Sequence, residues 1–164
     1  MSEPVLTATE LLAWTENTAE NWRQLLGEHP ELLAVDCDIA GVSTVGQLLQ
    51  HIVAVQLRYA ERLADLPVSD YANIPVDSIE AIYAVHQQSI AIFHRLLESE
   101  MDWDGPIEFV TRRMGPARSA RKTVLFHALL HGIRHYAQLA TLVRQHGVKP
   151  HWAMDYLFMN VRPA

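Results

Sequence analysis

The sequence contains one cysteine, Cys37, which excludes an intramolecular disulfide and fits a reducing compartment such as the cytoplasm. It has no uninterrupted apolar run long enough to span a bilayer, and its first residues lack the basic segment that begins a secretion signal. It also has no glycine-rich phosphate loop, so nothing in it supports nucleotide binding. We therefore expect a cytoplasmic protein that does not bind membranes.

Acidic and basic residues are divided between the two ends of the chain. Up to Thr111 there are 18 acidic and 4 basic residues (net −14), and from Arg112 onward there are 9 basic and 1 acidic (net +8). We expect the basic end to neutralise the earlier acidic helices, within one chain or across a dimer. A nucleic-acid surface is the alternative, but the sequence has no recognised binding motif and no interleaving of aromatic with basic residues.

Apolar residues recur at helical spacing in four long segments. The predicted helices run from about Thr7 to Leu26, from Thr44 to Leu63, from just after Asp77 to about Glu100, and from Ser119 to about Gln145. Thr7, Thr44 and Asp77 each precede a Glu or Gln by three residues, which is the spacing of a capping box, and Ser119 can cap the last helix. With 164 residues, 49% of them hydrophobic, the chain is long enough for one domain, residues 1–164, with a substantial core.

The segments between and after these helices are shorter. Glu31–Ser43 and Leu66–Pro75 are predicted to be loops. Ile107–Thr111 has the composition of a strand and is followed by a turn at Gly115-Pro116, which predicts a short hairpin before the fourth helix. Trp152–Phe158 is predicted to form a short C-terminal helix. The fold class that follows is an all-α, antiparallel four-helix bundle.

Histidines recur at four-residue steps in the fourth helix. His127, His131 and His135 lie one above the other on one face of Val124–Leu142, flanked by apolar residues. A neutral imidazole can bind a metal through one nitrogen while the other donates a hydrogen bond, and packing alone accounts poorly for three such rings on a largely apolar face. Gly132 follows His131, so this is not the HExxH motif of zinc proteases and brings no glutamate base.

His51 is the candidate third ligand beside His131 and His135. It lies on the inner edge of the second predicted helix, and facing helices of a bundle project side chains toward one another. Three histidines leave metal positions open, as in a catalytic site, where a metal lowers the pKa of a bound water or thiol or polarises a carbonyl. Histidine ligands suit zinc, nickel, iron or copper.

Each of these histidines also has a simpler interpretation. His131 and His135 could be paired core residues, and His51 a flanking residue with a backbone partner. His127 is expected to support or pack beside the site, and would bind metal only if the helix were rotated. His86 lies on the apolar stripe of the third helix, either as a core residue or facing the open metal position.

Basic residues cluster around the start of the fourth helix: Arg112, Arg113, Arg118, Arg121 and Lys122. They either recognise an anionic substrate, such as a carboxylate-bearing thiol, or pair with the acidic helices. Four aromatic residues are predicted to lie in the core, some of them also lining a pocket above the metal: Trp14, Trp22, Tyr59 and Phe93.

The segment HALLHGIRHYAQLATLVRQHGVKP resembles the final-helix signature of the DinB-like (DinB/YfiT) superfamily. The matching positions are His127, His131, His135, Gln138, Leu142, Arg144 and Gly147. Asp155 before an apolar pair is also similar to the C-terminal segment of that family, whereas Tyr136 departs from it, because the family often has arginine after the last histidine. With the four helical segments, the resemblance extends over nearly the whole chain.

This resemblance implies a bundle of the DinB/YfiT type that binds a divalent metal through His51, His131 and His135. Zinc or nickel would be the first candidates, and iron or manganese the next. Some relatives use the metal to activate a low-molecular-weight thiol in transferase or isomerase reactions. The resemblance also implies a homodimer.

We therefore expect a metal-dependent enzyme of thiol-transferase or hydrolase type, which uses a metal-activated thiol or water. Its substrate would be a low-molecular-weight thiol or another small anionic molecule, and the sequence assigns no general base. The alternatives are a non-catalytic metal-binding or stress-response protein, and a helical interaction module whose histidines are structural.

Overall fold

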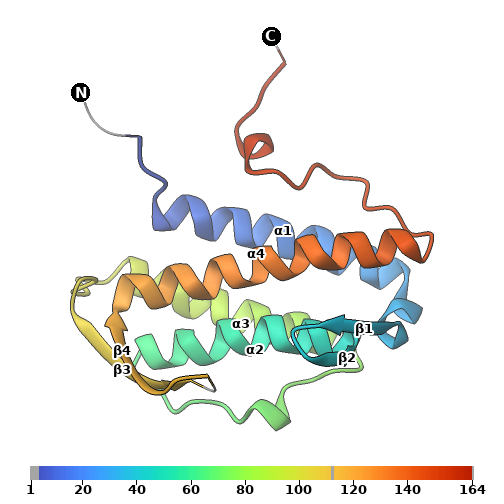
Figure 1. The fold of residues 1–164 in the computed structure, drawn as a ribbon. Coiled ribbons are helices and arrows are strands. Elements are labelled where there is room, and N and C mark those ends of the chain that lie inside the picture. Colours follow the sequence, from blue (N-terminus) through green and yellow to red (C-terminus); the bar gives the residue numbers. More distant parts are fainter. Residues whose placement is uncertain (1–3, 112, 164) are drawn as a thin grey trace.

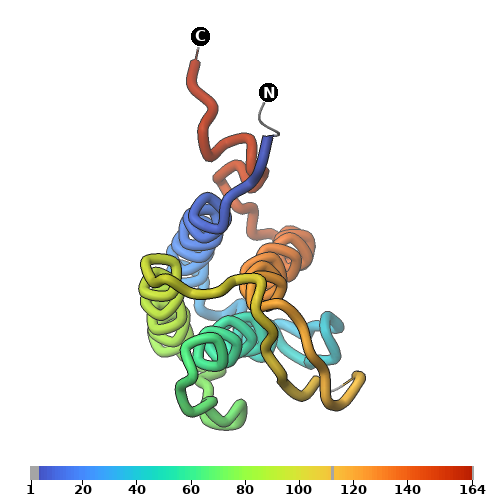
Figure 2. Tube along the Cα trace, turned by 90° about the vertical axis from the view of Figure 1, so that its left-hand side faces the viewer, coloured from blue at the N-terminus to red at the C-terminus, as the bar shows by residue number. Residues whose placement is uncertain are grey.

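The computed structural model describes residues 4–111 and 113–163, and its main elements are four long helices (Figure 1). They are α1 (Ala8–Glu28), α2 (Val45–Leu63), α3 (Ile79–Leu97) and α4 (Arg121–Gln145). Helix α2 packs against α3 and α4, and α1 packs against the same two helices. Figure 2 shows the four helices around a common interior. The described chain is therefore mostly helical and consistent with a bundle.

Large apolar side chains from all four helices fill this interior. The most fully buried include Leu12, Trp22, Leu48, Ile52, Ile82, Phe93, Leu129 and Leu139. Burying a side chain of this size contributes about 1.5–3 kcal/mol each. The helical spacing of apolar residues in the sequence thus corresponds to the faces that the helices bury.

Side-chain caps fix the starts of the first three helices. The Thr7 hydroxyl accepts from the Glu10 backbone N–H (3.2 Å), and the Glu10 carboxylate accepts from the Thr7 N–H (2.9 Å), which confirms the predicted capping box. Thr44 caps α2 through the Gln47 N–H (3.2 Å). The cap of α3 is Ser78, one residue later than the Asp77 that was predicted.

The start of α4 is held differently from the prediction. Ser119 does not cap it, because Ser119 belongs to strand β4 (Gly115–Ala120), which leads directly into the helix. Instead, the backbone N–H of Arg121 donates to the Gly105 carbonyl (3.0 Å), and that of Lys122 donates to the Trp103 carbonyl (2.9 Å). The loop before β3 therefore satisfies backbone donors of α4 that a side-chain cap usually satisfies.

Two small antiparallel sheets correct the all-α prediction. The predicted hairpin before α4 is present as β3 (Pro106–Thr111) paired with β4, in a register from Pro106 opposite Ala120 to Thr111 opposite Gly115. It lies beside α2, where the Phe109 ring meets the Tyr59 ring edge-on at 5.8 Å. This hairpin is one wall of the cavities described below.

The second sheet, β1 (Asp36–Ile39) paired with β2 (Val42–Thr44), was predicted to be a loop. Its turn places Ala40 and Gly41 at φ of 57° and 73°, the backbone of a tight hairpin turn. Asn-Gly or Asp-Gly at these two positions would have predicted such a turn, whereas Ala-Gly does not. The hairpin therefore gave no clear signal in the sequence.

Three short 3₁₀ turns complete the described elements: η1 (Pro30–Ala34), η2 (Tyr71–Asn73) and, after α4, η3 (Tyr156–Met159). The C-terminal helix predicted over Trp152–Phe158 is thus only η3, which begins four residues later. Trp152 packs edge-on against Trp22 of α1 (5.3 Å between ring centroids), which ties the C-terminal segment to the bundle. No helix within residues 4–111 and 113–163 is long and apolar enough to cross a membrane.

Candidate metal centre

Three histidines from two helices face one another where α2 packs on α4. His131 and His135 stand one turn apart on α4, and their Nε2 atoms are 3.2 Å apart. His51 of α2 lies across from them, with ring centroids 4.8 Å from His131 and 5.2 Å from His135. One ligand atom from each ring can be chosen so that all lie within 4.8 Å of one another. The structure therefore brings together the three residues that the sequence predicted.

A close approach of α2 and α4 makes this arrangement possible. Gly132 follows His131, and a Cβ added there would lie 3.0 Å from Gln56 Nε2 and 3.4 Å from Ile52 Cγ2 of α2. A larger residue at this position would push α2 away or displace the Gln56 side chain. The glycine thus allows His51 to reach the level of His131 and His135.

Burial keeps the two α4 histidines neutral. His131 is 8% exposed and His135 is 2% exposed. Burial, helped by the neighbouring His135 and His51, lowers the pKa of His131 to about 2, and burial also lowers the pKa of His135. A neutral imidazole has a free lone pair, which is the form that binds a metal.

Neighbouring polar atoms orient the rings. His135 Nδ1 lies 2.7 Å from Gln138 Oε1, so a protonated Nδ1 donates to this amide and leaves the lone pair on Nε2. Arg134 Nη2 lies 3.1 Å from the same Nε2, so a metal bound there would displace this exposed arginine. His131 Nδ1 is buried and has no hydrogen-bond partner among the described residues.

The donor set fits a divalent ion such as zinc. Metal–nitrogen bonds of about 2.0–2.1 Å in tetrahedral geometry place two ligand nitrogens about 3.3 Å apart, close to the 3.2 Å between His131 and His135. Without a metal, the Nε2–H of one ring can donate to the unprotonated Nε2 of the other at this distance, whereas a metal shared by the two rings needs both Nε2 atoms unprotonated. A cation between them would satisfy both lone pairs.

The other two candidate histidines lie outside this group. His127 is exposed; its ring packs edge-on against Tyr59 (5.4 Å) and lies 5.5 Å from His131, which agrees with a packing role. His86 is 2% exposed, and its Nδ1 lies 2.9 Å from Gln56 Oε1, while burial lowers its pKa to about 4. His86 is therefore a core residue. Sequence reasoning missed its partner Gln56, whose only signal was a polar residue within an apolar stripe.

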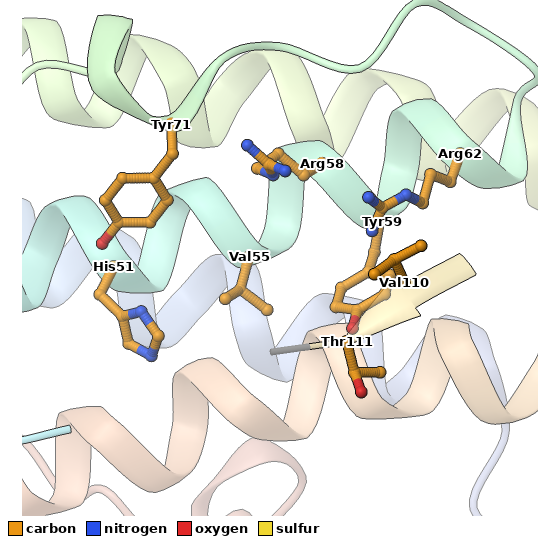
Figure 3. A pocket seen from close by; sticks show the side chains of 8 residues that line it. All are labelled: His51, Val55, Arg58, Tyr59, Arg62, Tyr71, Val110 and Thr111. Carbon is orange, nitrogen blue, oxygen red and sulfur yellow. The ribbon is translucent and has the colours of Figure 1, made fainter. Parts of the chain in front are cut away.

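A cavity of about 220 Å³ opens beside His51 (Figure 3). Its lining residues come from α2, η2 and β3: His51, Val55, Arg58, Tyr59, Arg62, Tyr71, Val110 and Thr111. A second, mainly apolar cavity of about 250 Å³ shares Tyr59 and Thr111 with it and includes His127. Sequence reasoning found Tyr59 but missed Arg58, Arg62 and Tyr71, because only the packing of α2, η2 and β3 brings them together.

The other aromatic residues have different places. Trp22 and Phe93 are wholly buried in the core, as predicted, and do not line the cavity beside His51. Trp14 is partly buried and packs edge-on against Tyr156 of the C-terminal segment (5.4 Å). Of the four aromatic residues predicted for the core, only Tyr59 lines the cavity beside His51.

The basic residues around the start of α4 do not form the predicted pairs with the acidic helices among the described residues. Lys122 forms an ion pair with Asp104, and Arg121 donates to the Asp102 carbonyl (3.4 Å), so both contact the loop before β3 rather than the acidic helices. Arg113 and Arg118 are exposed, and Arg112 lies outside the described residues.

Comparison with protein families matches residues 1–162 to the model described as DinB family. Comparison with curated proteins gave no match.

Proposed function

The chain belongs to the DinB family, and on this premise we propose that His51, His131 and His135 bind one divalent metal ion in a metal-dependent enzyme of thiol-transferase or hydrolase type. The observation that carries this proposal is the facing of three imidazoles, of which His131 and His135 are buried and neutral and His51 lines a cavity. Zinc or nickel suits three imidazole ligands best, and the family resemblance adds iron or manganese as the next candidates.

The chain's own residues would prepare this site in three ways. Gln138 fixes the tautomer of His135, so that Nε2 presents its lone pair. Burial of His131 and His135 keeps both rings neutral, with one proton each, at neutral pH. Val55, Tyr59 and Val110 supply the apolar part of the lining of the adjoining cavity. A metal bound here would supply a lowered pKa for a thiol or a water molecule.

Metal analysis of the purified protein tests the site. We expect about one divalent ion per chain in the wild type, and loss of it in His51→Ala and His131→Ala. His86→Gln is the matched control, because His86 is as buried as His135 but faces Gln56, and it should retain the metal. A wild-type protein that holds no metal and takes up neither zinc nor nickel would refute the site and leave the histidines structural.

Access of a thiol to the metal tests the enzymatic part. In cobalt-loaded protein, a thiol that reaches the ion gives a charge-transfer absorption band. We expect such a band with 2-mercaptoethanol. If no thiol and no small anion changes the spectrum, the protein is a non-catalytic metal-binding protein instead.

The finer assignments made from the sequence stay predictions. They are the antiparallel DinB/YfiT topology, a single domain over residues 1–164, a homodimer and a cytoplasmic location.

A further inference from the structure

The cavity beside His51 follows one face of α2. His51, Val55, Arg58 and Arg62 succeed one another at steps of three or four residues, so they lie in a row along the helix. Figure 3 shows His51 at one end and Tyr59 with Arg62 at the other, with Val55 and Arg58 between them. The cavity therefore extends from His51, one member of the three-histidine cluster, to two arginine side chains.

The charge of this lining is opposite to that of the protein. The whole chain carries −6, yet none of the residues that line the cavity is acidic and two are arginines. Neither Arg58 nor Arg62 forms an ion pair with a described carboxylate. A metal ion held by three neutral histidines would keep its own positive charge. The loaded cavity would thus be positive at both ends.

The structure holds these guanidinium groups in place. Arg58 Nη1 donates to the Ser69 carbonyl (3.0 Å), and Ser69 is itself held by Glu61, whose carboxylate accepts from the Ser69 N–H (2.7 Å) and hydroxyl. The Arg62 guanidinium lies 5.6 Å from the centre of the Tyr59 ring, a cation–π contact. The single contact of Arg58 leaves most of its five N–H donors for a ligand.

We propose that Arg58 and Arg62 form an oxyanion subsite, which binds the carboxylate or phosphate group of a small substrate whose other end reaches the three-histidine cluster. Arginine binds both groups through paired hydrogen bonds. The apolar surface of Val55, which lies between His51 and the Tyr59–Arg62 end in Figure 3, suits a short carbon chain. Arg58 is seven residues after His51, about 10 Å along the helix, so a molecule of a few carbon atoms bridges the ends.

This inference rests on the proposed function for the reacting end of the substrate, and a matched pair of thiols tests it. In cobalt-loaded protein, the charge-transfer band reports binding of 3-mercaptopropionate and of its neutral isostere 3-mercaptopropionamide. We expect the acid to bind about tenfold more tightly than the amide, because charge-assisted hydrogen bonds to buried or half-buried groups contribute this much. Displacement by propionate or by methyl phosphate distinguishes a carboxylate subsite from a phosphate subsite.

Substitutions assign the preference to its residues. In Arg58→Gln, Arg62→Gln and the double variant, the preference for the acid should fall stepwise toward none, with the affinity for the amide unchanged. Arg95→Gln removes the same charge from an exposed position on α3 and should behave as the wild type. Thermal unfolding of each variant controls for folding. An acid preference that persists in the double variant, or that is absent from the wild type, would overturn the subsite.

The two proposals fail in different ways. If the amide gives the band but the acid has no advantage, the subsite is wrong and the metal site stands. If neither thiol gives a band, the thiol-dependent part of the proposed function fails, and the subsite is judged on metal-free protein instead. There, propionate but not propionamide should shift the NMR signals of the Arg58 and Arg62 Nε–H groups, and no shift would overturn the subsite.

Discussion

The three-histidine cluster and the His86–Gln56 pair are both buried between helices, but their polar atoms face different partners. His86 Nδ1 meets an amide oxygen at 2.9 Å, so this ring nitrogen has a hydrogen-bond partner within the core. His131 Nε2 meets another imidazole nitrogen, His135 Nε2, at 3.2 Å, and the adjoining cavity opens beside His51. Burial lowers the pKa of both His86 and His131. Burial alone therefore does not distinguish a ligand from a core residue; the facing partner and the access to a cavity do.

The largest expected effect is a difference in zinc affinity between a variant of the three-histidine cluster and a variant of the His86–Gln56 pair. His135→Ala should weaken zinc binding by more than the roughly 10- to 100-fold that loss of an outer partner costs. His86→Gln should leave zinc affinity as in the wild type. Titration against a chelating indicator measures both. Equal losses in the two variants would mean that the regions do not differ in the way the structure indicates.

The second prediction concerns the free energy of unfolding, for which His86 should matter more than an exposed histidine of the same helix. His86→Ala should lower the free energy of unfolding by about 2–4 kcal/mol, because it leaves a cavity and an unpaired Gln56 in the core. His94→Ala, on the exposed face of the same helix, should cost less than about 1 kcal/mol, since its contact with Glu16 is at the surface. Chemical denaturation of metal-free protein measures both, and similar costs would contradict the core assignment.

The third prediction concerns pH. Burial lowers the pKa of His86 from its usual 6.5 to about 4, so the folded protein keeps this ring neutral in a range where the unfolded chain binds a proton. Stability is therefore full above about pH 6.5 and falls as the pH decreases toward 4. Between pH 7 and pH 5 the metal-free wild type should lose about 2 kcal/mol more than His86→Gln. Parallel curves of unfolding free energy against pH would show that His86 does not carry this dependence.

The smallest effect tests the orientation of a ligand. Gln138→Ala removes the acceptor that holds His135 Nδ1 and should weaken zinc binding about tenfold, the lower end of the range for such partners, since water can replace an exposed amide. Gln145→Ala, exposed at the end of the same helix, is the control and should have no effect. If Gln138→Ala binds zinc as the wild type does, His135 is oriented by packing alone.

Several features followed from the sequence because they depend on residues within one helical turn. The alignment of His131 with His135 needs only the period of the helix, and the capping box of Thr7 with Glu10 needs only three residues. The third ligand candidate, His51, was predicted from its place on the inner edge of its helix and from the DinB resemblance. The family match over residues 1–162 confirms that resemblance.

Other features gave no clear signal in the local sequence. The hairpin β3–β4 was predicted, but β1–β2 replaced a predicted loop and turns at an Ala-Gly pair, which is not a strong turn signal. The loop carbonyls of Trp103 and Gly105 hold the start of α4 where Ser119 was predicted to cap it. In each case the competing partner was invisible in the local pattern.

By itself, the sequence determined the four helices, their buried faces and the histidine row on α4, because periodicity and caps are local. Only the tertiary structure decided that His86 pairs with Gln56, thirty residues away in the chain, and that Arg58, Arg62 and Tyr71 share a cavity with His51. The physical reason is that the rotation and approach of packed helices select which side chains meet. That selection depends on close-packed contacts such as Gly132 against α2, which no local period specifies.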